Sequence, residues 1–124
     1  MSSDFAVPEA TIASIQAAYR ARELSVVELV RAYLGRIEAY DRDGPALNAV
    51  VVSSEQALAR AEQLDREEPT GALHGIPVVL KDNINTSDMP TSYGSVAMRG
   101  YQPPEDATVA REFVAATLYG SGPS

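Results

Sequence analysis

The sequence predicts an α/β fold, from the order of its apolar segments and the spacing of apolar residues within them. Residues 76–80 (Ile-Pro-Val-Val-Leu) carry no polar side chain, which suits a strand that is covered on both faces. Leu47–Val52 is rich in β-branched residues and also predicts a strand. A helical pattern separates the two segments, so we expect a right-handed crossover that joins two parallel strands.

Helices precede these strands. The first is expected from about Glu9 to Arg22, because Pro8 suits a helix start and because Ile12, Ile15 and Tyr19 recur at helical spacing. This segment is expected to pack through that apolar face.

Three further helices are predicted. Residues 25–28 (Ser-Val-Val-Glu) form a capping box that starts the second helix, and residues 43–45 (Asp-Gly-Pro) end it. A second box at residues 53–56 (Ser-Ser-Glu-Gln) starts the third helix, which ends at residues 69–71. The last helix is expected from about Asp106 to Leu118. The apolar positions of the second and third helices are Val30, Tyr33, Leu34 and Ile37, then Ala57, Leu58, Ala61 and Leu64.

The predicted strands are too few for a stable sheet. A fully apolar parallel strand needs a neighbour on each edge, and only Leu47–Val52 is available beside residues 76–80. The chain is therefore predicted to be a piece of a larger domain or an assembly partner, and the exposed strand edge favours self-association.

Composition excludes several classes of function. The 124 residues suit one domain or part of one, and the net charge of −7 argues against nucleic-acid binding. The absence of cysteine excludes thiol catalysis, and a single histidine, His74, makes a zinc site improbable. We predict no metal, no organic cofactor and no membrane span. Since residues 1–4 show no secretory pattern, the cytoplasm is the expected location.

Lys81 is the main candidate for chemistry. It follows the apolar strand at its carboxyl end, where parallel sheets usually present catalytic groups. A lysine that is held in apolar surroundings loses hydration, which favours the neutral amine and makes it a base. The alternative is that Lys81 extends its head group into water, as strand-terminal lysines commonly do. A triad of His74, Asp82 and Ser95 is a further alternative that only composition recommends.

Several motifs resemble the amidase signature family. The most specific is Gly75-Ile76-Pro77, followed by the apolar run and by Lys81-Asp82-Asn83. Others are residues 24–30, 33–37, 47–50, 89–95 and 104–109. The likeness covers about Thr11–Arg111, and the tail 112–124 is atypical. The resemblance implies that residues 1–124 are the N-terminal part of an amidase domain, with helices and the first strands of a mixed sheet.

The resemblance also implies a mechanism. In that family a neutral lysine at the place of Lys81 takes a proton from a cis-serine, which takes one from the nucleophilic serine that attacks the amide. Ser92, Tyr93 and Ser95 follow in a polar loop and are candidates for contact with a small amide substrate. The alternatives are that the serines cap turns and that Tyr93 packs in a core. The identity of the amide stays open between peptide, fatty, aromatic and glutamine amides.

The chain departs from the family where the two catalytic serines are expected, because it ends before the serine-rich segment of relatives. Ser121 lacks that context. A truncated reading frame or a shift of frame is the hypothesis for the atypical tail, and the nucleotides beyond codon 124 test it. We therefore expect a segment that is inactive alone. A non-catalytic interaction module and a small enzyme using Ser95 or Ser121 with Lys81 are the alternatives.

Overall fold

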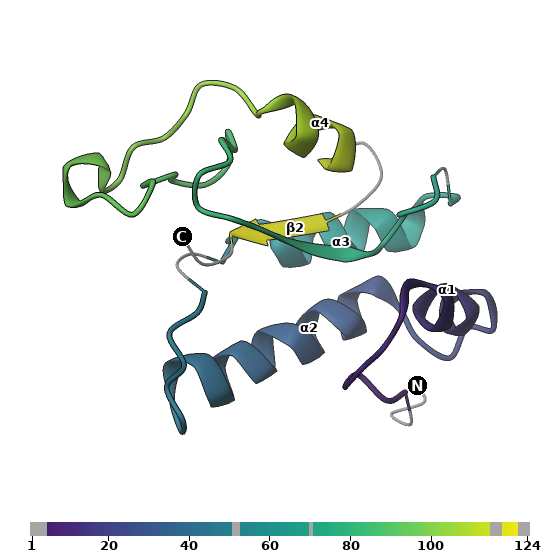
Figure 1. The fold of residues 1–124 in the computed structure, drawn as a ribbon. Coiled ribbons are helices and arrows are strands. Elements are labelled where there is room, and N and C mark those ends of the chain that lie inside the picture. Colours follow the sequence, from purple (N-terminus) through teal and green to yellow (C-terminus); the bar gives the residue numbers. More distant parts are fainter. Residues whose placement is uncertain (1–4, 51–52, 70, 115–117, 122–124) are drawn as a thin grey trace.

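The computed structural model describes residues 5–50, 53–69, 71–114 and 118–121, and within them helices surround a two-stranded sheet (Figure 1). In chain order the elements are α1 (Ile12–Arg20), α2 (Val26–Arg36), the π-helix η1 (Ile37–Arg42), α3 (Ala57–Arg66), β1 (Pro77–Leu80), the 3₁₀ helix η2 (Val96–Met98), α4 (Thr108–Val114) and β2 (Leu118–Ser121). The strands lie between α4 on one side and α2 on the other (Figure 1).

Capping boxes start the first two helices. The box predicted for α2 is confirmed, since Ser25 and Glu28 exchange side-chain and backbone hydrogen bonds of 3.2 and 3.0 Å. In α1 the box is formed by Thr11 and Ser14, so this helix begins at Ile12 and not at Glu9, which adopts a positive φ of 60° in the preceding turn. Reciprocal capping of free N–H groups fixes both starts.

The third and fourth helices differ from the expectation in detail. The predicted box at residues 53–56 is wrong, because Gln56 is the N-cap of α3 and makes no side-chain capping bond. The Ser54 hydroxyl instead accepts the N–H of Gln56 at 3.2 Å in the turn before the helix. The last helix, α4, ends at Val114, and Leu118 begins a strand where a helix was expected.

The sheet pairs β1 with β2 in parallel, with Pro77 opposite Leu118 and Leu80 opposite Ser121. The predicted strand over Leu47–Val52 is wrong for residues 47–50, which are irregular, and residues 51–52 lie outside the described ranges. Two features prevent a strand there. Ala46 and Asn48 adopt positive φ angles of 51° and 55°, which a strand excludes. The Asp41 carboxylate also accepts the N–H groups of Ala49 and Val50, at 2.6 and 3.2 Å.

Three apolar clusters form the core of the described residues. The α2–α3 cluster contains Val26, Val30, Ala57, Ala61 and Leu64. The cluster between α1, α2 and the start of β1 contains Ile15, Ala18, Leu24, Leu29 and Ile76. Leu80, Met89 and Ala110 form the third, between β1, the following loop and α4. Coverage of residues 76–80 on both faces was expected but is wrong at Val79, which is 61% exposed.

Polar contacts fasten α1 and α3 to the elements between them. Asp65 of α3 accepts the N–H groups of Val26 and Val27 at 2.8 and 3.1 Å and so caps α2 from outside. The Tyr19 hydroxyl donates to the carbonyl oxygen of Gly75 at 2.6 Å. Burial raises the pKa of Tyr19, and the nearby Asp65 and Tyr33 raise it further. These contacts fix the turn from which β1 departs.

None of the helices in the described ranges has the length and hydrophobicity that crossing a bilayer requires.

Candidate active site

Lys81 stands directly after β1, at the carboxyl end of this strand, as the sequence predicts. Its backbone carbonyl accepts the N–H of Ile84 at 3.0 Å, so the chain turns at once after the strand. The Lys81 side chain is exposed, while Leu80 before it and Asp82 after it are buried. The apolar surroundings expected for the lysine are therefore not formed by the described residues.

Asp82 holds the loop that follows. Its carboxylate is 2% exposed and accepts both the hydroxyl and the backbone N–H of Ser92, the latter at 3.0 Å. The backbone carbonyl of Asp82 accepts the N–H of Tyr93, also at 3.0 Å. Residues 83–93 thus fold back on the position next to Lys81. Successive residues of an extended chain point to opposite faces, which separates the exposed lysine from the buried carboxylate.

Further hydrogen bonds fix the outer part of the loop. The N–H and the hydroxyl of Ser87 both donate to Asp106, at 2.6 and 3.1 Å. The N–H of Thr91 donates to the carbonyl of Tyr101 at 2.9 Å, and Thr91 itself is buried. The sequence analysis did not identify Ser87, Asp106 or the role of Asp82. The available signal was their residue type, since Ser and Asp commonly bond to nearby backbone in turns.

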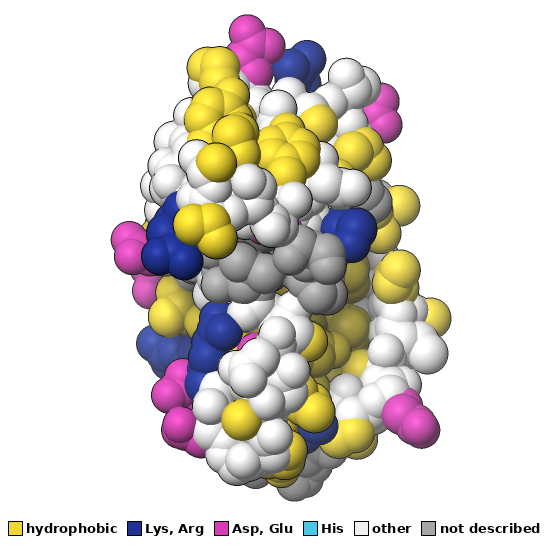
Figure 2. Space-filling view, turned by 60° about the vertical axis from the view of Figure 1, so that its left-hand side comes forward, with side chains coloured by type: hydrophobic (Ala, Val, Ile, Leu, Met, Phe, Trp, Pro, Cys, Tyr) yellow, Lys and Arg dark blue, Asp and Glu magenta, His cyan; other side chains and the backbone are white. Residues whose placement is uncertain are grey.

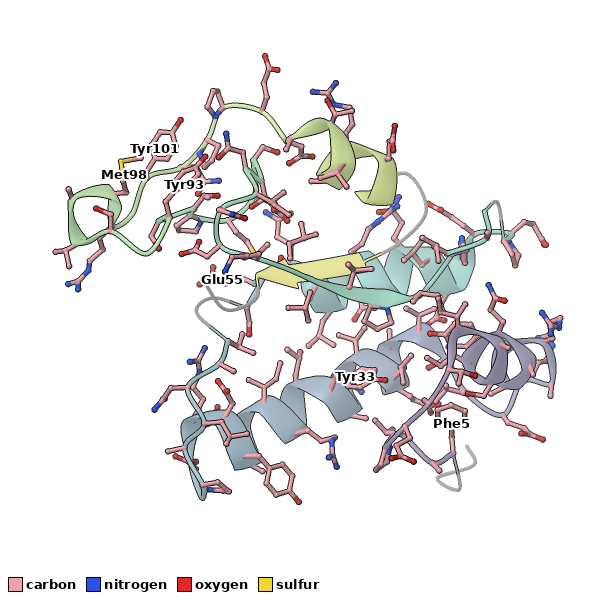
Figure 3. All side chains as sticks on the ribbon, in the orientation of Figure 1. Phe5, Tyr33, Glu55, Tyr93, Met98 and Tyr101 are labelled. Carbon is pink, nitrogen blue, oxygen red and sulfur yellow. The ribbon has the colours of Figure 1, made fainter. Side chains whose placement is uncertain are left out.

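The three loop candidates have different environments. The Ser92 hydroxyl is committed to Asp82, whereas Ser95 is exposed at the start of η2 and makes no side-chain capping bond. Tyr93 is exposed, so the core-packing alternative for this residue is wrong, and its hydroxyl donates to Asn85. Tyr93 lies on the same lobe as Met98 and Tyr101 (Figure 3). Hydrophobic side chains gather on this end of the molecule (Figure 2).

The alternative triad is not assembled. His74 is buried and its Nε2 lies 3.0 Å from the carbonyl oxygen of Leu64, which is a structural contact. Asp82 is engaged by Ser92, and Ser95 is exposed on the lobe of η2. These three residues therefore form no nucleophilic site. Over the described ranges, no group of three or more His, Cys, Asp or Glu side chains is placed to hold a metal ion.

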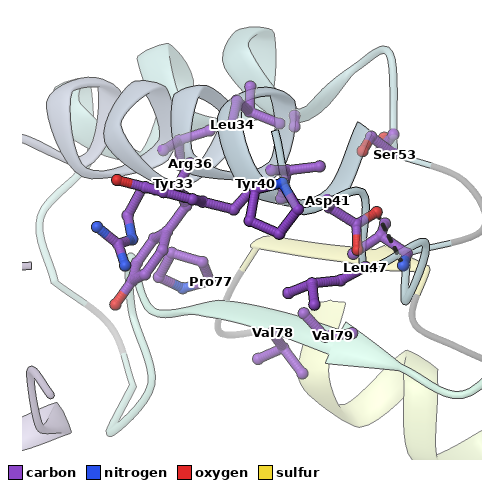
Figure 4. Close-up of a pocket in the computed structure, with 16 residues that line it drawn as sticks. Tyr33, Leu34, Arg36, Tyr40, Asp41, Leu47, Ser53, Pro77, Val78 and Val79 are labelled. Atoms are coloured by element: carbon purple, nitrogen blue, oxygen red, sulfur yellow. Dashed lines mark hydrogen bonds between the residues drawn. The ribbon is translucent and has the colours of Figure 1, made fainter. Parts of the chain in front are cut away.

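A cleft of about 560 Å³ opens between the α2–η1 helix and β1, away from Lys81 (Figure 4). We call it the strand-edge cleft. Its lining is mostly apolar, and the sequence analysis did not foresee it because it is formed by elements far apart in the chain. The lining residues are Val30, Tyr33, Leu34, Arg36, Ile37, Tyr40, Asp41, Pro45, Leu47, Val50, Ser53, Ser54, Ala57, Pro77, Val78 and Val79.

Comparisons with known proteins agree on one family. A family model described as Amidase matches residues 28–121. The chain is 39% identical to a probable amidase of Arabidopsis thaliana over 118 residues, which is 90% of this chain and 22% of that protein. It is 41% identical to a glutamyl-tRNA(Gln) amidotransferase polypeptide of Streptomyces coelicolor over 112 residues, which is 87% of this chain and 22% of that polypeptide.

A solved structure is similar over nearly the whole chain. The native peptide amidase from Stenotrophomonas maltophilia superposes with a TM-score of 0.90 and 41% identity, covering 96% of this chain and 26% of the peptide amidase. The present chain therefore spans about a fifth of the length of its curated relatives and about a quarter of the peptide amidase.

Proposed function

The chain belongs to the amidase family, and from this premise we propose that it is the lysine-bearing N-terminal segment of a carboxamide-cleaving enzyme, inactive alone. The observation that carries the proposal is the position of Lys81. It lies within the matched residues 28–121, at the carboxyl end of β1, beside a loop that Asp82 holds in place.

The proposed chemistry is a proton relay through serines that other parts of an amidase supply. Lys81, as the neutral amine, accepts a proton from a cis-serine, and this serine accepts one from the nucleophilic serine. The nucleophile attacks the carboxamide carbon, and the protons return to the departing ammonia or amine and to the hydrolytic step. The exposure of Lys81 supports this division, because a neutral lysine requires apolar cover that the described residues do not provide.

The loop residues have distinct proposed roles. Tyr93 and Ser95 are exposed and are proposed to contact the amide substrate. Ser92 is proposed to contribute to the same surface through its position, because its hydroxyl is held by Asp82. The chemical class of the amide stays open.

We further propose that residues 1–124 form part of one amidase domain, in which β1 and β2 belong to a larger mixed sheet, and that this domain acts in the cytoplasm without metal or organic cofactor. The tail 112–124 was expected to be atypical, yet β2 lies within it. A strand at that place is compatible with membership of a larger sheet.

Complementation tests the proposed function. The chain is co-expressed with the part of the Stenotrophomonas maltophilia peptide amidase that follows the matched region, and carboxamide hydrolysis is assayed by ammonia release. We expect no hydrolysis by the chain alone, and hydrolysis by the complex that falls by about 10²–10⁴-fold in Lys81→Met, the range for loss of a general base. Arg99→Met removes another exposed cation and is the control. Equal rates for Lys81→Met and the parent complex would contradict the role of Lys81.

Two other functions have separate outcomes in the same assay. A non-catalytic interaction module is favoured by the strand-edge cleft, and it predicts a stable complex with no hydrolysis under any condition. An independent small enzyme using Ser95 or Ser121 predicts hydrolysis by the isolated chain that Lys81→Ala abolishes.

A further inference from the structure

We propose that the strand-edge cleft is the docking site for an apolar β-strand of the polypeptide that completes the amidase domain. The incoming strand pairs with the free edge of β1 and places its side chains against α2 and η1. This proposal rests on the proposed function, since it names the partner and the surface that complete the segment.

The cleft runs along an edge of β1 and not over one face of it. Val78 and Val79 are neighbours in a strand, so their side chains point to opposite faces, yet both line the cleft. β2 occupies the other edge in parallel register. Over the described ranges, no strand pairs with β1 on the cleft side. A backbone edge that is free in this way is the usual template for strand addition.

The walls of the cleft are apolar and open to solvent. Tyr33, Leu34 and Ile37 form the helical wall, opposite Val79 (Figure 4). Leu47 is 68% exposed and Val79 is 61% exposed, so two large apolar side chains of one cleft face water. Covering them removes apolar surface from water and favours association.

The charged groups at the cleft already have partners. The guanidinium of Arg36 lies 5.2 Å from the centroid of the Tyr40 ring. The Asp41 carboxylate accepts two backbone N–H groups and lies 3.6 Å from Arg42. No unpaired charge at the lining is left to select a charged ligand, so the occupant is apolar in its side chains.

The peptide amidase indicates which polypeptide supplies that strand. It matches 96% of this chain with a TM-score of 0.90, but this chain accounts for only 26% of it. The other parts of such a domain must contact this segment, and a free strand edge beside an apolar cleft offers the most contact area to a further strand. A second copy of this chain is a poorer occupant, because each copy carries a net charge of −7.

Cysteine protection tests the docking site without an activity assay, because the chain has no native cysteine. V79C reports on the cleft, and E62C, on the exposed side of α3, is the control. Each variant is alkylated with N-ethylmaleimide, alone and in complex with the co-expressed remainder of the peptide amidase, and mass spectrometry locates the label. We expect alkylation of V79C to slow at least tenfold in the complex and that of E62C to be unchanged.

A charge placed in the cleft gives a second measurement. V79K is expected to weaken co-purification with the remainder at least tenfold. V96K adds the same charge at a valine that is 78% exposed and lies outside the cleft, and it is expected to have no effect. Thermal melting of both variants checks that the chain still folds.

Several results overturn the inference. V79C that reacts equally fast in the complex excludes cover by the partner. Protection that grows with the concentration of the isolated chain assigns the cleft to a second copy, and protection by a small apolar amide alone assigns it to a ligand. If the two polypeptides do not associate, V79C is placed in a single-chain hybrid in which this chain replaces the matching part of the peptide amidase, and fast alkylation there overturns the inference. Protection of V79C in a complex that Lys81→Met leaves equally active supports the docking site while contradicting the proposed function.

Discussion

The buried carboxylate of Asp82 accepts both the hydroxyl and the backbone N–H of Ser92, ten residues further along the chain. This pairing joins the end of β1 to the loop that carries Tyr93 and Ser95. The loop is thus held at two ends, by Asp82 near the strand and by the contact between Ser87 and Asp106 near α4. The surface around Lys81 consequently depends on a carboxylate that the relay itself does not use.

Removing the Asp82 carboxylate is expected to loosen the loop. Asp82→Ala leaves two donors of Ser92 without their acceptor, which costs about 1–3 kcal/mol in a buried site. Ser92→Ala is expected to cost less, because the backbone N–H bond of 3.0 Å to Asp82 remains. Trypsin cleavage after the exposed Arg99 measures the loosening and is expected to be faster in Asp82→Ala than in Ser92→Ala. Equal cleavage rates in the parent chain and Asp82→Ala would mean that the carboxylate does not hold the loop.

The cap that α3 provides to α2 gives a second prediction. Asp65→Ala removes the acceptor of the Val26 and Val27 N–H groups and is expected to lower the free energy of unfolding by about 1 kcal/mol. The urea midpoint measures this change. Asp43→Ala removes an exposed carboxylate that follows η1 and is the control. A midpoint shift in Asp43→Ala as large as in Asp65→Ala would show that the effect is one of net charge and not of capping.

Local signals in the sequence predicted the local structure well. The Ser25–Glu28 box, the end of the second helix at residues 43–45 and the strand before Lys81 are each set by neighbouring residues, and each is confirmed. The helix over residues 57–66 is also confirmed, although its capping box is not. Such features depend on backbone propensities and on bonds between residues a few positions apart.

Long-range pairing was beyond the sequence. Whether residues 47–50 form a strand depends on Asp41, whose carboxylate captures the N–H groups that a sheet would need. The partner of β1 is β2, in a Gly- and Ser-containing segment with weak strand propensity. The strand-edge cleft arises from the same pairing, because it lies where the expected neighbour of β1 is absent within the described ranges.

A close approach at Gly75 gives a third prediction. Gly75 has a φ of +76°, and a Cβ added there would lie 2.8 Å from Val26 Cγ2 and 3.0 Å from Tyr19 Cε2. Gly75→Ala is therefore expected to destabilise through both the backbone conformation and the contact. Gly100 is a matched control, because its φ is +78° but no atom lies within 4 Å of an added Cβ. Gly100→Ala is expected to cost only the strain, about 1–2 kcal/mol, and Gly75→Ala about 1–3 kcal/mol more, from overpacking.

Urea unfolding of both glycine variants separates the two terms. The difference between their free energies of unfolding reports the contact with Val26 and Tyr19, since the backbone strain is common to both. Equal losses would mean that the packing around Gly75 relaxes without cost.

The pH dependence of stability follows from Tyr19. Its folded-state pKa is raised, first by burial and then by Asp65 and Tyr33, so the folded chain holds this phenolic proton at a pH where the unfolded chain has released it. The unfolded state therefore binds fewer protons above about pH 10, the ordinary value for tyrosine, and the free energy of unfolding falls as pH rises. The stabilising contribution is fully present below that pH and is lost on the way up to the folded-state pKa.

Thermal melting of the parent chain and Tyr19→Phe between pH 8 and pH 11 measures this effect. Tyr19→Phe loses the hydrogen bond of 2.6 Å to Gly75 and is expected to melt lower than the parent at pH 8. Its melting temperature should then fall less steeply with pH, so the two curves converge towards pH 11. Tyr101→Phe changes an exposed tyrosine and should follow the parent curve. Parallel curves for the parent and Tyr19→Phe would show that the buried hydroxyl does not control alkaline unfolding.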